Sequence, residues 1–328
     1  MSSDPMRDAG GPPQPAMDEV RPSLVARLLA PILRRFMKQR LQRLTASGVV
    51  ETAVVHSSRT RLERLARLGG SRSAGVRLEK EKIGDVSVEL LTPPAPRAGL
   101  HLLYVHGGAF AMGSPRTHRG LTRRLAIACS ACAVVPDYSL APEHPWPEGL
   151  MDVLAVYRGL LARGVAPSRI VVAGESAGGN LALALGHALK ERGGPQPAGI
   201  ACTSPWADLV GTGASLEAHR DQDMMVPVDA MPVAARMYAG DHDLRTPTIS
   251  PLYGDFHGFP PLLIHVSSSE VLYDDACRVV QAAQAAGVSA ELRVWPHVPH
   301  AFPAFADILP EARAAVAEIA AFVARVVP

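Results

Sequence analysis

A serine framed by small residues is the feature of this sequence with the clearest chemical meaning. Residues 174–178 read Gly-Glu-Ser-Ala-Gly, after the apolar run 171–173 and before a stretch rich in Ala and Leu. A sharp turn from a strand into a helix favours glycine two positions before and two positions after the serine, because side chains there would collide. Such a turn exposes the serine hydroxyl, so the pattern predicts Ser176 as a nucleophile for acyl transfer.

A second glycine-rich segment also follows an apolar run. Residues 106–109 read His-Gly-Gly-Ala. Acyl transfer develops negative charge on a substrate oxygen, and backbone N–H groups must already point at it. We predict this oxyanion hole from the N–H groups of Gly107, Gly108 and Ala177, against the alternative of an ordinary glycine-rich turn. His106 precedes the serine in the chain, so we interpret it as an organiser of the loop and not as the base.

The base should lie late in the chain. A serine hydroxyl is a weak nucleophile that needs an adjacent base. On an α/β-hydrolase sheet the order along the chain is Ser, then Asp or Glu, then His. His297 and His300 follow the apolar segment 290–295, so both are candidates.

Three carboxylates compete for the role of the acid that orients this base. Glu270, Asp274 and Asp275 all follow the apolar segment 261–266. Asp274 and Asp275 stand where a helix is expected to begin, and carboxylates there cap free N–H groups. Glu270 lies just beyond the expected strand end, where the functional loops of an α/β sheet gather. We therefore favour Glu270 as the acid.

The elements that must position these residues alternate along the chain. Apolar, β-branched runs predict eight strands, near 76–82, 86–92, 100–105, 132–136, 169–174, 198–203, 261–266 and 290–295. Helical spacing separates most of the later ones, at 147–163, 177–192, 275–286 and 310–326. This alternation predicts an α/β fold with a mostly parallel eight-stranded sheet and helices on both faces.

Several longer motifs, in order, give the chain a family resemblance. It resembles the hormone-sensitive-lipase-like esterases (bacterial family IV) of the α/β-hydrolase fold. Residues 106–109 resemble the family's HGGG motif, residues 174–179 its GDSAGG elbow, and residues 137–147 its DYRLAPEHPFP segment. Segments 204–209, 250–252 and 270–275 also match, and the resemblance extends from about residue 75 to the C-terminus.

The resemblance implies a function and a set of residues. It implies a Ser176–Glu270–His300 triad that hydrolyses short- to medium-chain acyl esters through an acyl-enzyme, with no metal or organic cofactor. The chain departs from the family pattern in three places: Ala109 replaces the third glycine, Glu175 replaces Asp, and Glu270 stands where many members carry Asp. None of these changes removes a catalytic group.

Three aromatic residues stand close to these motifs. Phe110 follows the oxyanion segment, Tyr138 lies in segment 137–147, and Trp206 lies in segment 204–209. Each belongs either to the core or to the wall of the acyl pocket. We predict that the three contact the substrate.

The first third of the chain differs in composition from the rest. Residues 1–20 are rich in Pro, Gly and Asp and are expected to be disordered. We expect a helical N-terminal cap over 21–75, and a catalytic domain over 76–328 with a cap insertion near 207–245.

Within 21–45, apolar residues recur near helical spacing among seven basic residues and no acidic one. One hypothesis is a helix on a membrane surface. The other, which we favour, is a helical cap over the active site, as the resemblance implies, and Pro31 is expected to bend or divide it into two short helices. These would bury Leu28, Ile32 and Phe36 against segment 207–245.

Charge and cysteine content exclude other classes of protein. Residues 1–100 carry seventeen Lys and Arg against ten Asp and Glu, whereas the rest of the chain is net acidic, so the catalytic body is not expected to bind nucleic acid. Arg27 interrupts the early apolar run, which argues against a signal peptide. Cys129 and Cys132 are interpreted as buried apolar residues rather than as a metal or redox motif. These features favour a cytoplasmic protein.

Two other functions stay open at this point. An amidase or acyltransferase could use the same triad, and a non-catalytic binding protein could use the same fold. The presence of both Ser176 and His300 argues against the second. The expected partner is a small-molecule ester, and the sequence does not decide whether the chain forms a homodimer.

Overall fold

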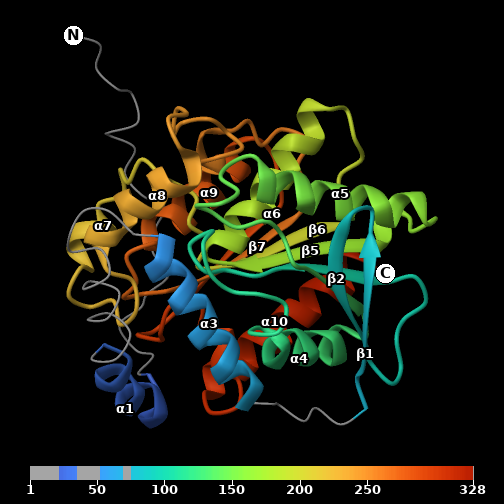
Figure 1. Ribbon diagram of the computed structural model, residues 1–328. Helices are drawn as coiled ribbons and strands as arrows, with labels where there is room; N and C mark the ends of the chain where they lie inside the picture. The colour runs from blue at the N-terminus through green and yellow to red at the C-terminus, as the bar shows by residue number, and fades with distance from the viewer. Residues whose placement is uncertain (1–21, 35–51, 69–74, 328) are drawn as a thin grey trace.

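An eight-stranded sheet forms the centre of the molecule (Figure 1). The computed structural model describes residues 22–34, 52–68 and 75–327. The strand order is β1-β2-β4-β3-β5-β6-β7-β8, with β2 antiparallel to β1 and β4 and the remaining pairs parallel. The strands are β1 (Arg77–Ile83), β2 (Val86–Thr92), β3 (His101–Val105), β4 (Cys132–Pro136), β5 (Ile170–Glu175), β6 (Gly199–Thr203), β7 (Leu262–Ser267) and β8 (Ala290–Trp295). The predicted fold class is confirmed.

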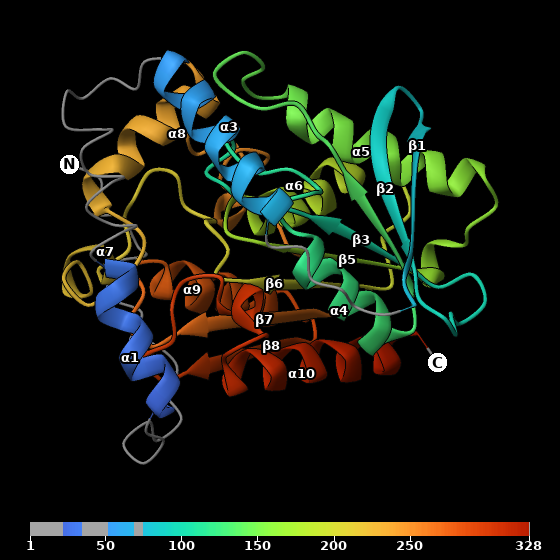
Figure 2. The same ribbon diagram turned by 60° about the horizontal axis from the view of Figure 1, so that its bottom comes forward.

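Helices cover both faces of the sheet. Along β3, Leu103 and Val105 pack into the core shared with α5 (Glu148–Ala162), α6 (Ala177–Glu191) and α9 (Tyr273–Ala285). Leu102 and Tyr104 point to the opposite core, which α4 (Arg119–Cys129) and α10 (Pro310–Val326) cover (Figure 2). The central strands are therefore buried on both sides, which explains why their sequences are apolar runs and not alternating patterns.

The edge of the sheet carries a different sequence. The β1 strand reads Arg-Leu-Glu-Lys-Glu-Lys-Ile and is largely exposed. Charged side chains on an edge strand oppose pairing with other chains. The carboxyl ends of β5, β6, β7 and β8 meet at one edge of the parallel part of the sheet, and the loops there hold the residues discussed below.

Shorter elements complete the fold. Between β6 and β7 the chain forms α7 (Ser215–Ala218) and α8 (Met231–Ala239), within the segment in which a cap insertion was expected. Single 3₁₀ turns are η2 (Pro167–Arg169), η3 (Val228–Ala230), η4 (Pro251–Tyr253) and η5 (Phe302–Phe305). Among the described residues, none of the helices is long and apolar enough to cross a bilayer.

The N-terminal helices differ from the prediction. In α1 (Leu24–Leu33), Leu28 and Ile32 are 70% and 54% exposed, so their expected burial is wrong. Ala26 is the buried residue of α1 instead, because bonds from Ser23 to Glu311 of α10 fix which side of the helix faces the protein. The helix runs through Pro31 without dividing. The predictions for Phe36 and for residues 1–20 lie outside the described residues.

Candidate active site

Ser176 sits on a strained turn between β5 and α6. Its backbone has φ 56° and ψ −124°, a region that residues with a side chain rarely adopt. Two bonds to the end of β6 and the segment after it hold the turn: the Ser176 N–H donates to Thr203 O (3.0 Å), and Ser176 O accepts the Trp206 N–H (3.1 Å). The strand–turn–helix context predicted for the serine is therefore present.

The glycines of the elbow are required by close backbone contacts. A Cβ on Gly178 would lie 2.1 Å from Val105 O, at the end of β3, and a Cβ on Gly174 would lie 2.4 Å from Gly178 O. The elbow therefore packs directly against the start of the oxyanion loop, residues 106–113. This contact fixes the distance between the serine and that loop.

The close contact at Gly178 predicts that a side chain at this position destabilises the fold. Gly178→Ala is expected to lower the free energy of unfolding by about 3 kcal/mol, because the methyl group would collide with backbone that cannot rotate away. Chemical denaturation monitored by circular dichroism measures the change. Gly194→Ala is the control, since its nearest neighbour is the Leu189 side chain at 3.2 Å, and a change within about 1 kcal/mol is expected. Equal stability of the two variants would contradict the packing described here.

Glu270 and His300 form a buried pair. His300 Nδ1 lies 2.9 Å from Glu270 Oε2, and Glu270 Oε1 accepts the Ser267 N–H at 3.0 Å. His297, the competing base, is exposed, and its N–H donates to Ser268 Oγ on the outside of the same loop. The geometry therefore separates the two histidines that the sequence left open.

The end of β6 and the residue after it connect this pair with the elbow. Thr203 O, the last carbonyl of β6, accepts the Ser176 N–H, and the next residue, Ser204, accepts the Ala301 N–H with its Oγ at 3.3 Å. Ser176 follows β5 and His300 lies in the loop after β8, so strands far apart in sequence bring them to the same edge of the sheet.

Glu270 also sets the protonation of its partner. Burial by itself lowers the pKa of the His300 imidazole, but the hydrogen bond and charge of Glu270, with the charges of Asp223 and Glu175, raise that pKa above its ordinary value. Because a carboxylate faces Nδ1, the neutral ring keeps its proton there. Nε2 is left with a lone pair that can accept a proton.

Asp274 and Asp275 have a structural role that differs from the one expected. The N-terminus of α9 has no side-chain cap. Asp274 Oδ2 instead accepts the Ser215 N–H at 2.9 Å, and Asp275 Oδ2 accepts the Ala207 and Asp208 N–H groups, both at 2.8 Å. The two carboxylates therefore hold the segment 207–215, not their own helix.

In the oxyanion loop, one of the predicted donors already has a partner. The Gly107 N–H donates to the Glu175 carboxylate. The two following residues have positive φ, 124° for Gly108 and 53° for Ala109. A Cβ on Gly107 would lie 3.1 Å from Ser176 Cβ, so the loop passes directly beside the serine.

The three aromatic residues are all buried. Tyr138 donates from its hydroxyl to His106 O (2.7 Å) and stacks on the His106 ring, so it supports the oxyanion loop. This arrangement agrees with the interpretation of His106 as an organiser of the loop. Phe110 stacks on Tyr238 with ring centroids 3.7 Å apart and lies 5.7 Å from Trp206. Phe110 and Trp206 thus form an aromatic cluster beside the elbow.

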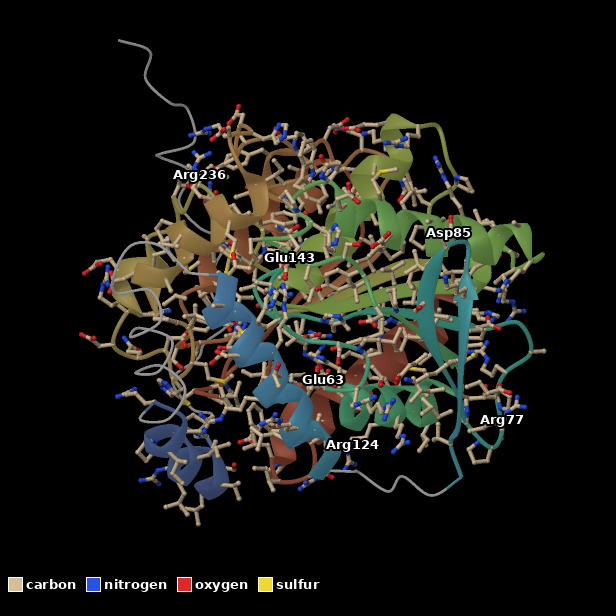
Figure 3. The ribbon with its side chains drawn as sticks, viewed as in Figure 1. Glu63, Arg77, Asp85, Arg124, Glu143 and Arg236 are labelled. Carbon is tan, nitrogen blue, oxygen red and sulfur yellow. The ribbon has the colours of Figure 1, made fainter. Side chains whose placement is uncertain are left out.

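Sequence reasoning missed the role of α3 (Thr52–Leu68). Arg59 on this helix donates to Ala111 O (2.6 Å) and pairs with Glu143 (2.7 Å), so it ties the oxyanion loop to the segment 141–143. Figure 3 shows Glu143 beside α3. The Arg59 guanidinium lowers the pKa of Glu143 to about 2. Arg59 carried no motif, and only the fold reveals its partners. Among the described residues, none of the His, Cys, Asp and Glu side chains group as metal ligands do.

Comparisons with known proteins show the family to which the chain belongs. A family model described as alpha/beta hydrolase fold matches residues 102–304. An acetyl-hydrolase of Streptomyces hygroscopicus is 41% identical over 240 residues, which cover 73% of this chain and 80% of that protein. An esterase of Acinetobacter venetianus is 36% identical over 253 residues, covering 76% and 80%. The crystal structure of an esterase from the bacterial hormone-sensitive lipase family superposes with a TM-score of 0.84 at 35% identity, covering 94% and 100%.

Proposed function

The chain belongs to the α/β hydrolase fold family and is a hydrolase of the esterase class, and from this premise we propose that Ser176, His300 and Glu270 cleave carboxylic esters through an acyl-enzyme. The observation that carries the proposal is the buried His300–Glu270 pair at the same sheet edge as the strained Ser176 turn. The segment 203–204 bonds to both sides of this arrangement.

The chemistry follows from the roles of the three side chains. His300 Nε2 takes the proton of Ser176 Oγ as that oxygen attacks the ester carbonyl. Glu270 keeps the ring in the tautomer that leaves Nε2 unprotonated and stabilises the imidazolium that forms. The imidazolium then gives its proton to the leaving alcohol. A water molecule, activated by the same ring, releases the acid from Ser176.

The tetrahedral oxygen needs donors beside the serine. We assign them to the N–H groups of Gly108, Ala109 and Ala177, because the Gly107 N–H is already bonded to Glu175. Ala177 is the first residue of α6, so the positive end of the helix dipole supports its N–H. Losing one such donor costs about 3 kcal/mol of transition-state stabilisation.

Short- to medium-chain acyl esters are the proposed substrates. The rings of Phe110, Trp206 and Tyr238 pack together beside the elbow, and we expect them to limit the length of the acyl group. A series of p-nitrophenyl esters of increasing acyl length tests this, with kcat/KM expected to fall beyond medium chains. The same assay should include an anilide substrate and an alcohol added as acyl acceptor. Faster cleavage of the anilide would indicate an amidase, and preferred acyl transfer to the alcohol would indicate an acyltransferase.

The paired imidazole predicts the pH dependence of activity. Because the pKa of His300 is raised, kcat/KM is expected to fall as the pH drops through a value above the ordinary one for histidine, where the base becomes protonated. Initial rates between pH 5 and 9 measure this limb. His297→Gln is the control and should leave it in place, since His297 is exposed. If the acid limb shifted in His297→Gln, the assignment of His300 as the base would be wrong.

A contact with lipid is proposed for α1. Leu24, Leu28 and Ile32 are spaced four residues apart and are all more than half exposed, within a sequence stretch that carries only basic charge. Leu28→Asp is expected to reduce co-sedimentation with anionic vesicles, whereas Ile127→Asp, at an exposed site on α4, should not. A change of oligomeric state in place of vesicle binding would mean that this face pairs with a second copy.

The free cysteines bear on the compartment. Cys129, Cys132, Cys202 and Cys277 are all unbridged thiols, as is usual for proteins of reducing compartments. We propose the cytoplasm on this ground.

A further inference from the structure

A buried carboxylate next to the nucleophile has no role in the triad. Glu175 precedes Ser176 and is 4% exposed. Three donors surround it: the Tyr104 hydroxyl at Oε2, and the Gly107 N–H and His118 Nε2 at Oε1, the last at 3.0 Å. Glu175 thus connects β3, the oxyanion loop and the residue that precedes α4. A buried carboxylate that accepts three hydrogen bonds is held in one orientation and makes the surrounding structure rigid.

The partners of His118 define its charge. Its Nδ1 lies 3.1 Å from Ser114 O and 2.9 Å from Thr117 Oγ1, and its Nε2 faces the Glu175 carboxylate. Thr117 Oγ1 donates its own proton to Ser114 O (2.9 Å), and a carbonyl and a carboxylate are acceptors only, so both ring nitrogens donate and the ring is an imidazolium. Burial disfavours its charge, but the charge and hydrogen bond of Glu175 and the bond to Ser114 O raise the pKa of His118. Burial likewise opposes the charge of Glu175, yet His118 and the other donors lower its pKa.

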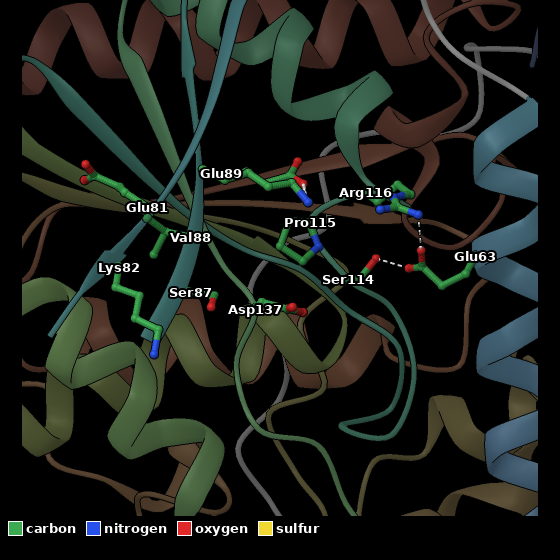
Figure 4. Close-up of a pocket in the computed structure, with 11 residues that line it drawn as sticks. Glu63, Glu81, Lys82, Ser87, Val88, Glu89, Ser114, Pro115, Arg116 and Asp137 are labelled. Carbon is green, nitrogen blue, oxygen red and sulfur yellow. Dashed lines mark hydrogen bonds and ion pairs between the residues drawn. The ribbon is translucent and has the colours of Figure 1, made fainter. Parts of the chain in front are cut away.

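The same segment is held from outside by α3. Ser114 Oγ donates to Glu63, whose other oxygen lies 3.4 Å from Arg116 Nη1. Figure 4 shows Glu63 reaching from α3 toward Ser114 and Arg116, beside a groove of about 550 Å³. Arg59, one turn earlier on α3, donates to Ala111 O. The segment 111–118 is therefore fixed between α3 and Glu175.

Apart from His300, whose protonation limits activity at low pH, the titratable groups around this pair keep a constant charge near neutral pH. His106 stacks on His118 with centroids 5.2 Å apart, and burial together with the charge of His118 lowers the pKa of His106 to about 3, so it is neutral. Tyr104 and Tyr138, on the other side, have pKa values raised well above the ordinary range, first by burial. Cys202, below Glu175, is also kept protonated by burial. Of the other charged side chains that contact the segment, Glu63 and Arg116 pair with each other, and Arg59 pairs with Glu143.

We propose that His118 is a positioning residue for the oxyanion loop: its imidazolium anchors Glu175, and Glu175 in turn holds the Gly107 N–H, which sets the direction of the next two N–H groups. The proposal rests on the proposed esterase function. The N–H groups of Gly108 and Ala109 follow Gly107 directly, so a rotation at Gly107 redirects both. Misplacement of a reacting group by about 1 Å can cost 100-fold in rate, so a loose loop is expected to act on kcat.

The test replaces the charged His118 ring by a neutral side chain that can still donate a hydrogen bond to Glu175. His118→Gln is expected to lower kcat by about 10- to 100-fold with KM nearly unchanged. In the wild type, kcat should decline at alkaline pH as His118 loses its proton, and this decline should be absent in the variant. Tyr104→Phe is the matched control, because it removes another donor to Glu175 and keeps the ion pair. It should have a smaller effect and retain the alkaline limb.

A second measurement does not depend on activity. Amide hydrogen exchange in residues 107–113 is expected to become faster in His118→Gln than in Tyr104→Phe. Unchanged exchange and an unchanged pH profile, or equal losses in both variants, would overturn the proposal. If the wild type cleaved no ester, the proposed function would fail, whereas the exchange measurement would still decide whether His118 holds the loop.

Discussion

Replacing Ser176 by alanine is expected to abolish ester hydrolysis, with kcat falling by about six orders of magnitude. The acyl-enzyme cannot form without the hydroxyl, and a triad without its nucleophile retains only the contribution of binding and the oxyanion hole. The fold should survive, because the turn depends on backbone bonds to Thr203 and Trp206 and not on the side chain. Thermal unfolding should therefore show a Tm close to that of the wild type.

Covalent labelling tests the same assignment of Ser176 without measuring turnover. A fluorophosphonate should label the wild type once, at Ser176, and peptide mapping should find no label in Ser176→Ala. Ser87→Ala, on the exposed side of β2, is the control and should keep both activity and labelling. Label on another serine, or substantial turnover by Ser176→Ala, would refute the assignment of the nucleophile.

The sheet could be predicted because burial on both faces leaves a strong local signal. All eight strands overlap their expected ranges, and α5, α6, α9 and α10 were expected as well. Helix α4 was not predicted, since it begins without a side-chain cap at His118 and its first turn carries no acidic residue. Local start signals were missing, and packing between β2 and α10 stabilises it instead.

Helical spacing alone does not tell which face of a helix is covered. In α1 the strongest apolar stripe includes Leu24 and Leu28, and it predicted a buried face. The structure buries Ala26 and part of Leu29, because the bonds of Ser23 to Glu311 orient the helix. A tertiary contact 288 residues away in sequence decided the orientation, and no local pattern contains it.

Local sequence patterns also could not predict every contact of the candidate site. The elbow and the His300–Glu270 pair follow from strand ends that a parallel sheet brings together, so their neighbourhood could be predicted. The bond of the Gly107 N–H could not be predicted, because its acceptor, Glu175, lies at the end of another strand. His118 carried no motif, and only its contacts with Glu175 and Ser114 identify it.

Exchanging the carboxylate of Glu270 for an amide is the other change with a large expected effect. Glu270→Gln should lower kcat by about 10⁴-fold, because a glutamine amide can donate to Nδ1 and so favour the tautomer that protonates Nε2. The side chain keeps its size, and Ser267 can still donate to its carbonyl oxygen, so the loop should hold its shape. The pKa of the remaining imidazole should also fall, since the hydrogen bond and charge of Glu270 are the largest of the effects that raise it against burial.

Asp274→Asn is the matched comparison, because it makes the same chemical change four residues later. Asp274 bonds to the Ser215 N–H and not to His300, and an asparagine oxygen can still accept that bond. We expect its kcat to stay within a few-fold of the wild type, and its stability to fall by about 1 kcal/mol. Steady-state kinetics and denaturation of both variants measure the two effects separately. An inactive Asp274→Asn beside an active Glu270→Gln would transfer the role of acid to Asp274. Such a result would require the first turn of α9 to move toward His300. Among the described residues, Glu270 already holds the hydrogen bond to His300 Nδ1.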